Sequence, residues 1–151
     1  EMEHARLTLS EARHDKADTY SKKLFLEAKA AYDSAMAIWR RENNRFIYFR
    51  NFEKVEMYAN LSAQKANQAT SSSQTNSSSL RVKIKDKIDS LNKIVISLDK
   101  LFSRYPISTE IRNRISKGRF LLKEGESAFS KGQYLPSNRK ITEAEYLLTG
   151  V

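Results

Sequence analysis

The chain has 151 residues, of which 40% are apolar and 30% charged, the size of one domain or of two helical layers that share a core. Charges interrupt the apolar residues throughout, so no run approaches the roughly 18 to 20 residues that span a bilayer. The absence of cysteine excludes disulfides, thiol catalysis and cysteine-based zinc sites. The net charge of +9 is uneven, with 12 basic and 10 acidic residues through Thr75 against 15 basic and 8 acidic from Asn76 onward.

The two ends of the chain are abrupt. It begins at Glu1 rather than at a methionine, and it ends at Val151 directly after an apolar helical pattern. We expect it to be a piece of a longer protein, with a signal or anchor segment or a catalytic domain outside it.

The first 105 residues contain neither glycine nor proline, which predicts long helices. A short helix is expected around Ala5, Leu9 and Ala12, and a join at 16–19, where Asp18 or Thr19 caps the next helix. That helix has apolar residues three and four positions apart on one stripe, which comprises Tyr20, Leu24, Ala28, Ala31, Ala35, Ile38 and Trp39.

A second stripe follows a turn predicted at 42–45, where paired asparagines favour a helix end. Its spacing averages roughly 3.6 residues, the helical period. Its members are Val55, Ala59, Ser62, Ala66, Ala69, Ser73, Ser77, Leu80, Ile84, Ile88, Leu91, Val95, Leu98, Phe102 and Tyr105.

The serine run at 71–79 has two interpretations. Its composition is typical of a flexible linker, and serine is a mediocre helix former. The apolar stripe nevertheless keeps its phase across the run. We therefore favour one very long helix, with a linker as the alternative.

The last third of the chain is punctuated by all four glycines and both prolines. Pro106 is expected to end the long helix, and Ser108 to cap the next one. That helix alternates large residues with glycine, as when two helices pass closely, in the stripe Ile111, Ile115, Gly118, Leu122, Gly125 and Phe129. Gly132 is predicted to terminate it, and Pro136 to lie in the first turn of a final helix with Ile141, Ala144 and Leu148 inside.

The segment from Ala5 to Ala69 resembles the helical regions of bacterial envelope lipoproteins and periplasmic proteins of unknown function. The resemblance lies in the helix YSKKLFLEAKAAYDSA at 20–35 and the helix RNFEKVEMYANLSAQKANQA at 50–69. It implies helical hairpins outside the inner membrane, in some members beside a peptidoglycan-binding or transpeptidase domain. This chain departs from the pattern by placing Asn43 and Asn44 where a turn glycine is expected.

A search for catalytic and metal motifs identifies no candidate site. His4 and His14 are ten residues apart in helical sequence, about 15 Å along the axis, and cannot share one ion. The sequence contains no HExxH motif, no nucleophile elbow and no phosphate-binding glycine loop. We therefore predict a protein that is not an enzyme and that uses no cofactor, metal or small-molecule substrate.

The strongest local cluster joins aromatic residues and arginines at 39–52, where a hairpin tip is expected. Such residues are enriched at binding hot spots and also stack on bases or sugars. The candidate partner surface comprises Trp39, Arg40, Arg41, Arg45, Tyr48 and Arg50. In the alternative interpretation, Trp39, Phe46, Phe49 and Phe52 close the end of the hairpin core and the arginines are solvated.

A second candidate is the basic cluster of the second half, an anion-binding surface made of Arg81, Lys83, Lys85 and Lys87. Its spacing also fits the solvated face of an ordinary amphipathic helix. No nucleic-acid-reading motif accompanies it, so nucleic acid is not an expected partner, whereas a membrane surface or cell-wall polymer is an alternative one.

The fold class predicted is all-α: an antiparallel bundle of about five helices with very long helices and TPR-like helical-hairpin character. We expect a single helical module over 1–151, with a hairpin at 1–70 and hairpins at 80–151. The expected function is that of a non-catalytic interaction or spacer module of a periplasmic or envelope protein, which binds a protein partner or positions a neighbouring domain. The alternatives are an anionic-ligand binder and an accessory region of a cell-wall enzyme such as a transpeptidase.

Overall fold

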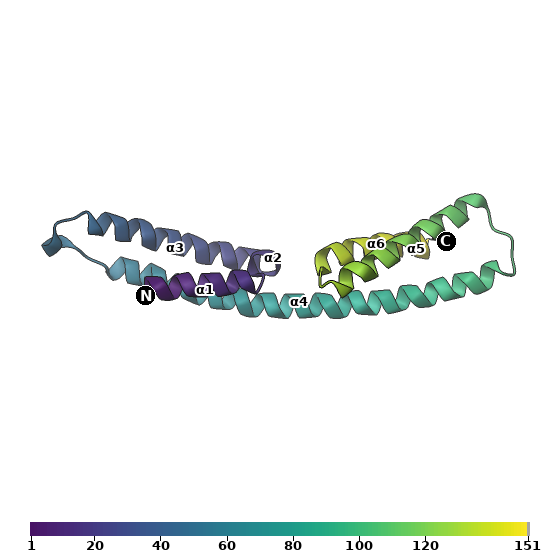
Figure 1. The fold of residues 1–151 in the computed structure, drawn as a ribbon, viewed down its shortest axis with the longest axis horizontal. Coiled ribbons are helices and arrows are strands. Elements are labelled where there is room, and N and C mark those ends of the chain that lie inside the picture. The colour runs from purple at the N-terminus through teal and green to yellow at the C-terminus, as the bar shows by residue number, and fades with distance from the viewer. Residues whose placement is uncertain (151) are drawn as a thin grey trace. The chain divides into compact units, whose positions relative to one another are not determined.

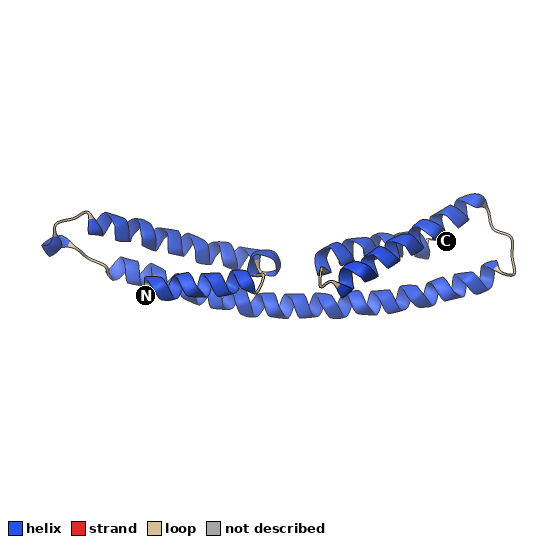
Figure 2. Cartoon of the chain, viewed as in Figure 1, coloured by secondary structure: helices blue, strands red, loops and turns tan. Residues whose placement is uncertain are grey.

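The computed structural model describes residues 1–150, and every regular element in them is a helix (Figure 2). The predicted all-α fold class is therefore confirmed. In chain order the elements are α1 (Met2–His14), α2 (Ala17–Tyr20), α3 (Lys22–Asn43), the 3₁₀ turn η1 (Ile47–Phe49), α4 (Glu53–Phe102), α5 (Thr109–Ser130) and α6 (Tyr134–Thr149) (Figure 1).

The chain divides into two compact units, residues 1–77 and residues 78–151, where the sequence analysis expected a single module. Helix α4 belongs to both, because its 50 residues begin in the first unit and end in the second. Each unit has apolar clusters of its own. The large aliphatic side chains of α4 resume only at Leu80, after the serine run, which separates the two sets of core residues.

Unit 1 is an antiparallel hairpin of α3 and the first part of α4, with α1 packed alongside (Figure 1). Its core consists mostly of alanine, whose small side chain lets helices approach closely. The buried members are Ala5, Ala12, Ala17, Phe25, Ala28, Ala35, Val55, Ala59, Ala66 and Ala69. The stripe predicted from Val55 to Ser73 is confirmed, since each of its residues there is buried.

The junction between α1 and α3 differs from the prediction. Asp18 and Thr19 lie inside α2 and cap nothing, because Lys16 adopts a left-handed backbone with φ of 57° and α2 begins at Ala17. The stripe of α3 is also shifted at both ends. Phe25 is buried beside a partly exposed Leu24, and Trp39 is 42% exposed.

The serine run is helical in the structure, so of the two interpretations of 71–79 the continuous helix is the observed one. Its polar side chains donate hydrogen bonds to backbone carbonyls at the ends of α1 and α2. Ser73 Oγ donates to the Asp15 carbonyl at 2.7 Å, and Asn76 Nδ2 donates to the Tyr20 carbonyl at 2.8 Å. These bonds give the run a structural role that its composition alone does not reveal.

Unit 2 packs the second part of α4, α5 and α6 around a core of larger aliphatic residues. As predicted, Ser108 caps α5, with its Oγ accepting the Ile111 N–H, and Gly132 ends the helix region with φ of 71°. Helix α4 ends at Phe102, however, so Tyr105 lies outside it and is exposed. Ile111 is also exposed.

Candidate functional site

The turn between α3 and α4 presents four consecutive large apolar residues to solvent. Phe46 is 68% exposed, Ile47 65%, Tyr48 84% and Phe49 66%. We call Phe46, Ile47, Tyr48 and Phe49 the tip residues. Burial of one such side chain stabilises a protein by roughly 1.5–3 kcal/mol, so four exposed together are a notable cost to the isolated chain.

These exposures contradict the interpretation in which the aromatic residues close the end of the hairpin core. Phe46 packs beside Tyr48 and Phe49, with ring centroids 5.6 and 6.5 Å apart, but none of the tip residues belongs to the core clusters of unit 1 or packs against them. The buried core ends before the turn, since the buried apolar residues nearest to it are Ala35 on α3 and Val55 on α4. The turn lies beyond the N-terminal end of α1 (Figure 1).

Glu42 stabilises the base of this turn. It is only 4% exposed, although it lies in the last turn of α3 among arginines. Its Oε2 accepts the Asn51 amide N–H at 3.1 Å and the Arg45 guanidinium N–H at 2.9 Å, and Arg41 Nε lies 3.6 Å from Oε1. The bond from the Asn51 N–H, followed by the bond from Arg45, lowers the pKa of the Glu42 carboxyl below its ordinary value.

Arg50 stabilises the same turn from the other side. Its guanidinium donates from Nη2 to the Asn43 carbonyl at 3.0 Å and from Nε to the Arg45 carbonyl at 3.2 Å. Carbonyls at the end of a helix have no helical partner, so a cation suits this position. Asn51 Oδ1 then accepts the Glu53 N–H at 2.9 Å and opens α4. The backbone on both sides of the tip residues is therefore fixed.

The candidate surface predicted from the sequence thus divides into two kinds of residue. Arg45 and Arg50 hold the turn, whereas Tyr48 is a presented residue. The Arg40 side chain is exposed and makes no hydrogen bond or ion pair within residues 1–150. Trp39 lies partly exposed in the last two turns of α3.

Sequence reasoning did not select Glu42 or Ile47. The available signal for Glu42 was that it is the one carboxylate in the segment 39–52, which also contains four arginines. For Ile47 the signal was its position inside an uninterrupted apolar tetrapeptide within a turn, where polar residues are the rule.

The basic cluster in unit 2 is less concentrated than its sequence implies. Arg81, Lys83 and Lys85 are exposed on α4, but Lys87 forms an ion pair with Glu145 of α6. Asp86 and Asp89 lie on the same helix. Other cations of this unit are also paired, since Arg119 binds Asp99 and Lys140 binds Glu124.

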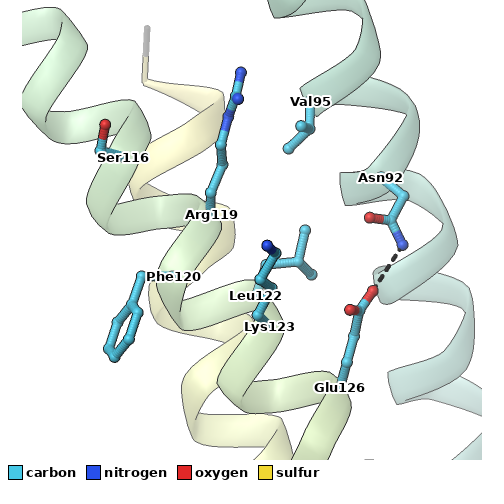
Figure 3. A pocket seen from close by; sticks show the side chains of 8 residues that line it. All are labelled: Asn92, Val95, Ser116, Arg119, Phe120, Leu122, Lys123 and Glu126. Carbon is cyan, nitrogen blue, oxygen red and sulfur yellow. Dashed lines mark hydrogen bonds between the residues drawn. The ribbon is translucent and has the colours of Figure 1, made fainter.

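Unit 2 also contains a hollow of about 460 Å³ between α4 and α5 (Figure 3). Asn92 Nδ2 donates to Glu126 Oε1 across it at 2.8 Å, and Phe120 points away from α4. Its lining residues are Asn92, Val95, Ser116, Arg119, Phe120, Leu122, Lys123 and Glu126. The cross-helix pair holds α4 to α5, and we assign no ligand to the hollow.

In the described part of the chain, no three histidine, cysteine or acidic side chains gather in a way that could hold a metal ion. Over residues 1–150, no helix is both long and apolar enough to cross a bilayer.

Comparison of the chain with protein-family models, with curated proteins and with solved structures found no match.

Proposed function

We propose that this chain is a non-catalytic interaction module that binds a partner surface through the tip residues. The observation that carries the proposal is the exposure of four consecutive large apolar side chains on a backbone fixed by Glu42 and Arg50. The buried Glu42 carboxylate and the two hydrogen bonds from Arg50 to backbone carbonyls hold the base of the turn in one conformation, which distinguishes it from a mobile loop. A partner that buries these apolar side chains removes them from water, and this makes the free energy of binding more favourable.

The arrangement also favours a binding role over catalysis. The tip residues include no carboxylate, imidazole or thiol, and Glu42, the single acidic residue of 39–52, is engaged in holding the turn. Aromatic and arginine side chains are the types enriched at binding hot spots. Proton transfer and metal binding would need groups of another kind.

Site-specific photo-crosslinking tests this proposal. A photo-reactive phenylalanine analogue replaces Tyr48 in the cells that make the protein, and Ile96 is replaced in a matched control because it is 55% exposed in unit 2. We expect a discrete adduct from position 48 that is absent from position 96 and is lost when Phe46 and Phe49 become serine. Equal adducts from both positions, or none from position 48, would contradict the proposal.

We further propose that the module acts in the bacterial cell envelope, outside the inner membrane. The support is the alanine-patterned likeness of 20–35 and 50–69 to helical hairpins of envelope lipoproteins. Fractionation of the full-length protein tests this, since recovery with the cytoplasm would count against it.

A further inference from the structure

We infer that the partner of the tip residues is the surface of a lipid bilayer that contains anionic lipids, an inference that rests on the proposed interaction function. Three features carry it: the exposure of the apolar side chains of the turn, the charge of the flanking residues, and the residue types that the turn combines.

The apolar side chains of the turn lie together and are open to solvent. The Phe46 ring packs beside the rings of Tyr48 and Phe49, with centroids 5.6 and 6.5 Å apart, and all four tip residues are at least 65% exposed. A bilayer surface can cover such a protruding cluster without a preformed groove of matching shape.

The residues that flank the tip carry positive charge. Arg40, Arg41, Arg45 and Arg50 are all exposed, and Glu42 is the single acidic residue of 39–52, which leaves a net +3 over that segment (four arginines less one glutamate). Glu42 is buried and bound to Asn51 and Arg45, so it offers little charge to an approaching surface. Anionic lipid headgroups attract such cations.

The composition of the turn also matches a membrane interface. Tyrosine, tryptophan and phenylalanine place an apolar ring among the acyl chains near the headgroups, and arginine binds phosphate there. Apolar groups of peripheral proteins enter the boundary of headgroups and acyl chains by about 5–10 Å. The tip residues supply the apolar groups for such a contact, and the flanking arginines supply the cations for the headgroups.

The full chain provides its own reporter for the test, because Trp39 is its only tryptophan and is partly exposed on α3 near the tip. The probes are vesicles of phosphatidylcholine and vesicles of an equal mixture of phosphatidylcholine and phosphatidylglycerol. We expect sedimentation with the mixed vesicles and a blue shift of Trp39 emission, both weakened by added salt. Binding to neither kind of vesicle would overturn the inference.

Two pairs of matched variants locate the contact. Tyr48→Ser with Phe49→Ser should weaken binding to mixed vesicles at least about tenfold, whereas Ile96→Ser with Leu101→Ser, exposed residues of unit 2, should not. Arg40→Gln with Arg41→Gln should weaken it by about fivefold for each arginine. Lys83→Gln with Lys85→Gln removes equal charge from the basic cluster and should leave it unchanged.

The outcomes separate this inference from the proposed function. If Lys83→Gln with Lys85→Gln abolishes vesicle binding and Tyr48→Ser with Phe49→Ser does not, the inference is overturned, because the vesicles then bind the basic cluster of unit 2. A crosslink from position 48 to a protein, together with no vesicle binding, would overturn the lipid inference and leave the interaction function in place. Absence of both the crosslink and vesicle binding would overturn both proposals.

Discussion

Glu42 stabilises a turn whose own side chains contribute little to folding. Its carboxylate joins the last turn of α3 to Asn51, nine residues along the chain, and so closes the loop on which the tip residues lie. Ser73 has a comparable role in unit 1, where a hydroxyl that is 1% exposed binds the Asp15 carbonyl. Both polar groups satisfy backbone atoms that the helices leave without partners.

Glu42 gives a prediction about pH. Because its pKa in the folded chain lies below the ordinary 4.5, its contribution is fully present above that value and is lost as the pH falls through the lowered pKa. We expect the wild type to unfold at higher urea concentration than Glu42→Gln at neutral pH, and the gap to close in acid. Other carboxyls titrate in both proteins and cancel in the comparison. A gap that is independent of pH would contradict the assignment.

Ser73 gives a prediction about stability. Ser73→Ala leaves the Asp15 carbonyl without its 2.7 Å donor and should lower the free energy of unfolding by about 1 kcal/mol. Ser78→Ala is the matched control, because Ser78 is exposed on the same helix and alanine is the better helix former there. Urea denaturation of the two variants should therefore give changes of opposite sign.

At the scale of elements, the contact between α5 and α6 depends on two glycines spaced seven residues apart. A Cβ on Gly118 would lie 2.8 Å from Leu148 Cγ and Cδ2, and a Cβ on Gly125 would lie 2.5 Å from Ile141 Cδ1. Ser137 uses the same close approach, since its buried Oγ donates to the Gly125 carbonyl at 2.7 Å. The alternation of glycine with large residues in the sequence correctly indicated this packing.

Gly125→Ala should destabilise unit 2. Alanine favours a helix by about 1 kcal/mol over glycine, but its Cβ would lie 2.5 Å from Cδ1 and 2.7 Å from Cγ1 of the fully buried Ile141, so that side chain must shift, and overpacking costs about 1–3 kcal/mol. Ser127→Ala on the exposed face of α5 should instead be neutral or stabilising. Adding Ile141→Val, which removes the Cδ1 atom, should recover part of the loss. Thermal unfolding of the four proteins measures this, and a stabilising Gly125→Ala would show that Ile141 can move.

At the scale of the whole molecule, two sets of core residues are distributed along one continuous helix. Unit 1 relies on alanine and unit 2 on isoleucine and leucine, and Ser78 and Ser79 are exposed residues of α4 that belong to neither set. Helix continuity at that point adds hydrogen bonds but no core contact. Packing inside each unit should therefore survive its interruption.

Ser78→Pro tests that independence. Proline removes one helical hydrogen bond and clashes with the preceding turn, at a local cost of about 3 kcal/mol or more. We expect hydrogen exchange to accelerate near 75–81 while amides at 55–69 and 84–98 keep their protection. Ser73→Pro is the contrasting variant and should also expose unit 1, because it removes a buried residue that binds the Asp15 carbonyl. Loss of protection in both units on Ser78→Pro would contradict independent packing.

The sequence predicts those parts of the fold that depend on periodicity. The stripe of α4 from Val55 to Leu91 needs only a spacing of three and four, and most of it is buried as expected. Periodicity does not decide which of two adjacent apolar residues is buried. It placed Leu24 in the core stripe of α3, whereas Phe25 is the buried residue. Hydrophobic character by itself favours a core position for phenylalanine, so Phe46 and Phe49 were assigned to the core in one interpretation, although both are exposed. The contact of Glu42 with Asn51 arises only when the loop has closed.

The bonds from Glu42 and Arg50 lie at the base of the turn, and neither uses a side chain from 46–49. What the hairpin displays is therefore separable from what holds the hairpin together. Different tetrapeptides grafted between Arg45 and Arg50 should be tolerated by the same scaffold, so related chains can diverge in binding target while their helices stay the same.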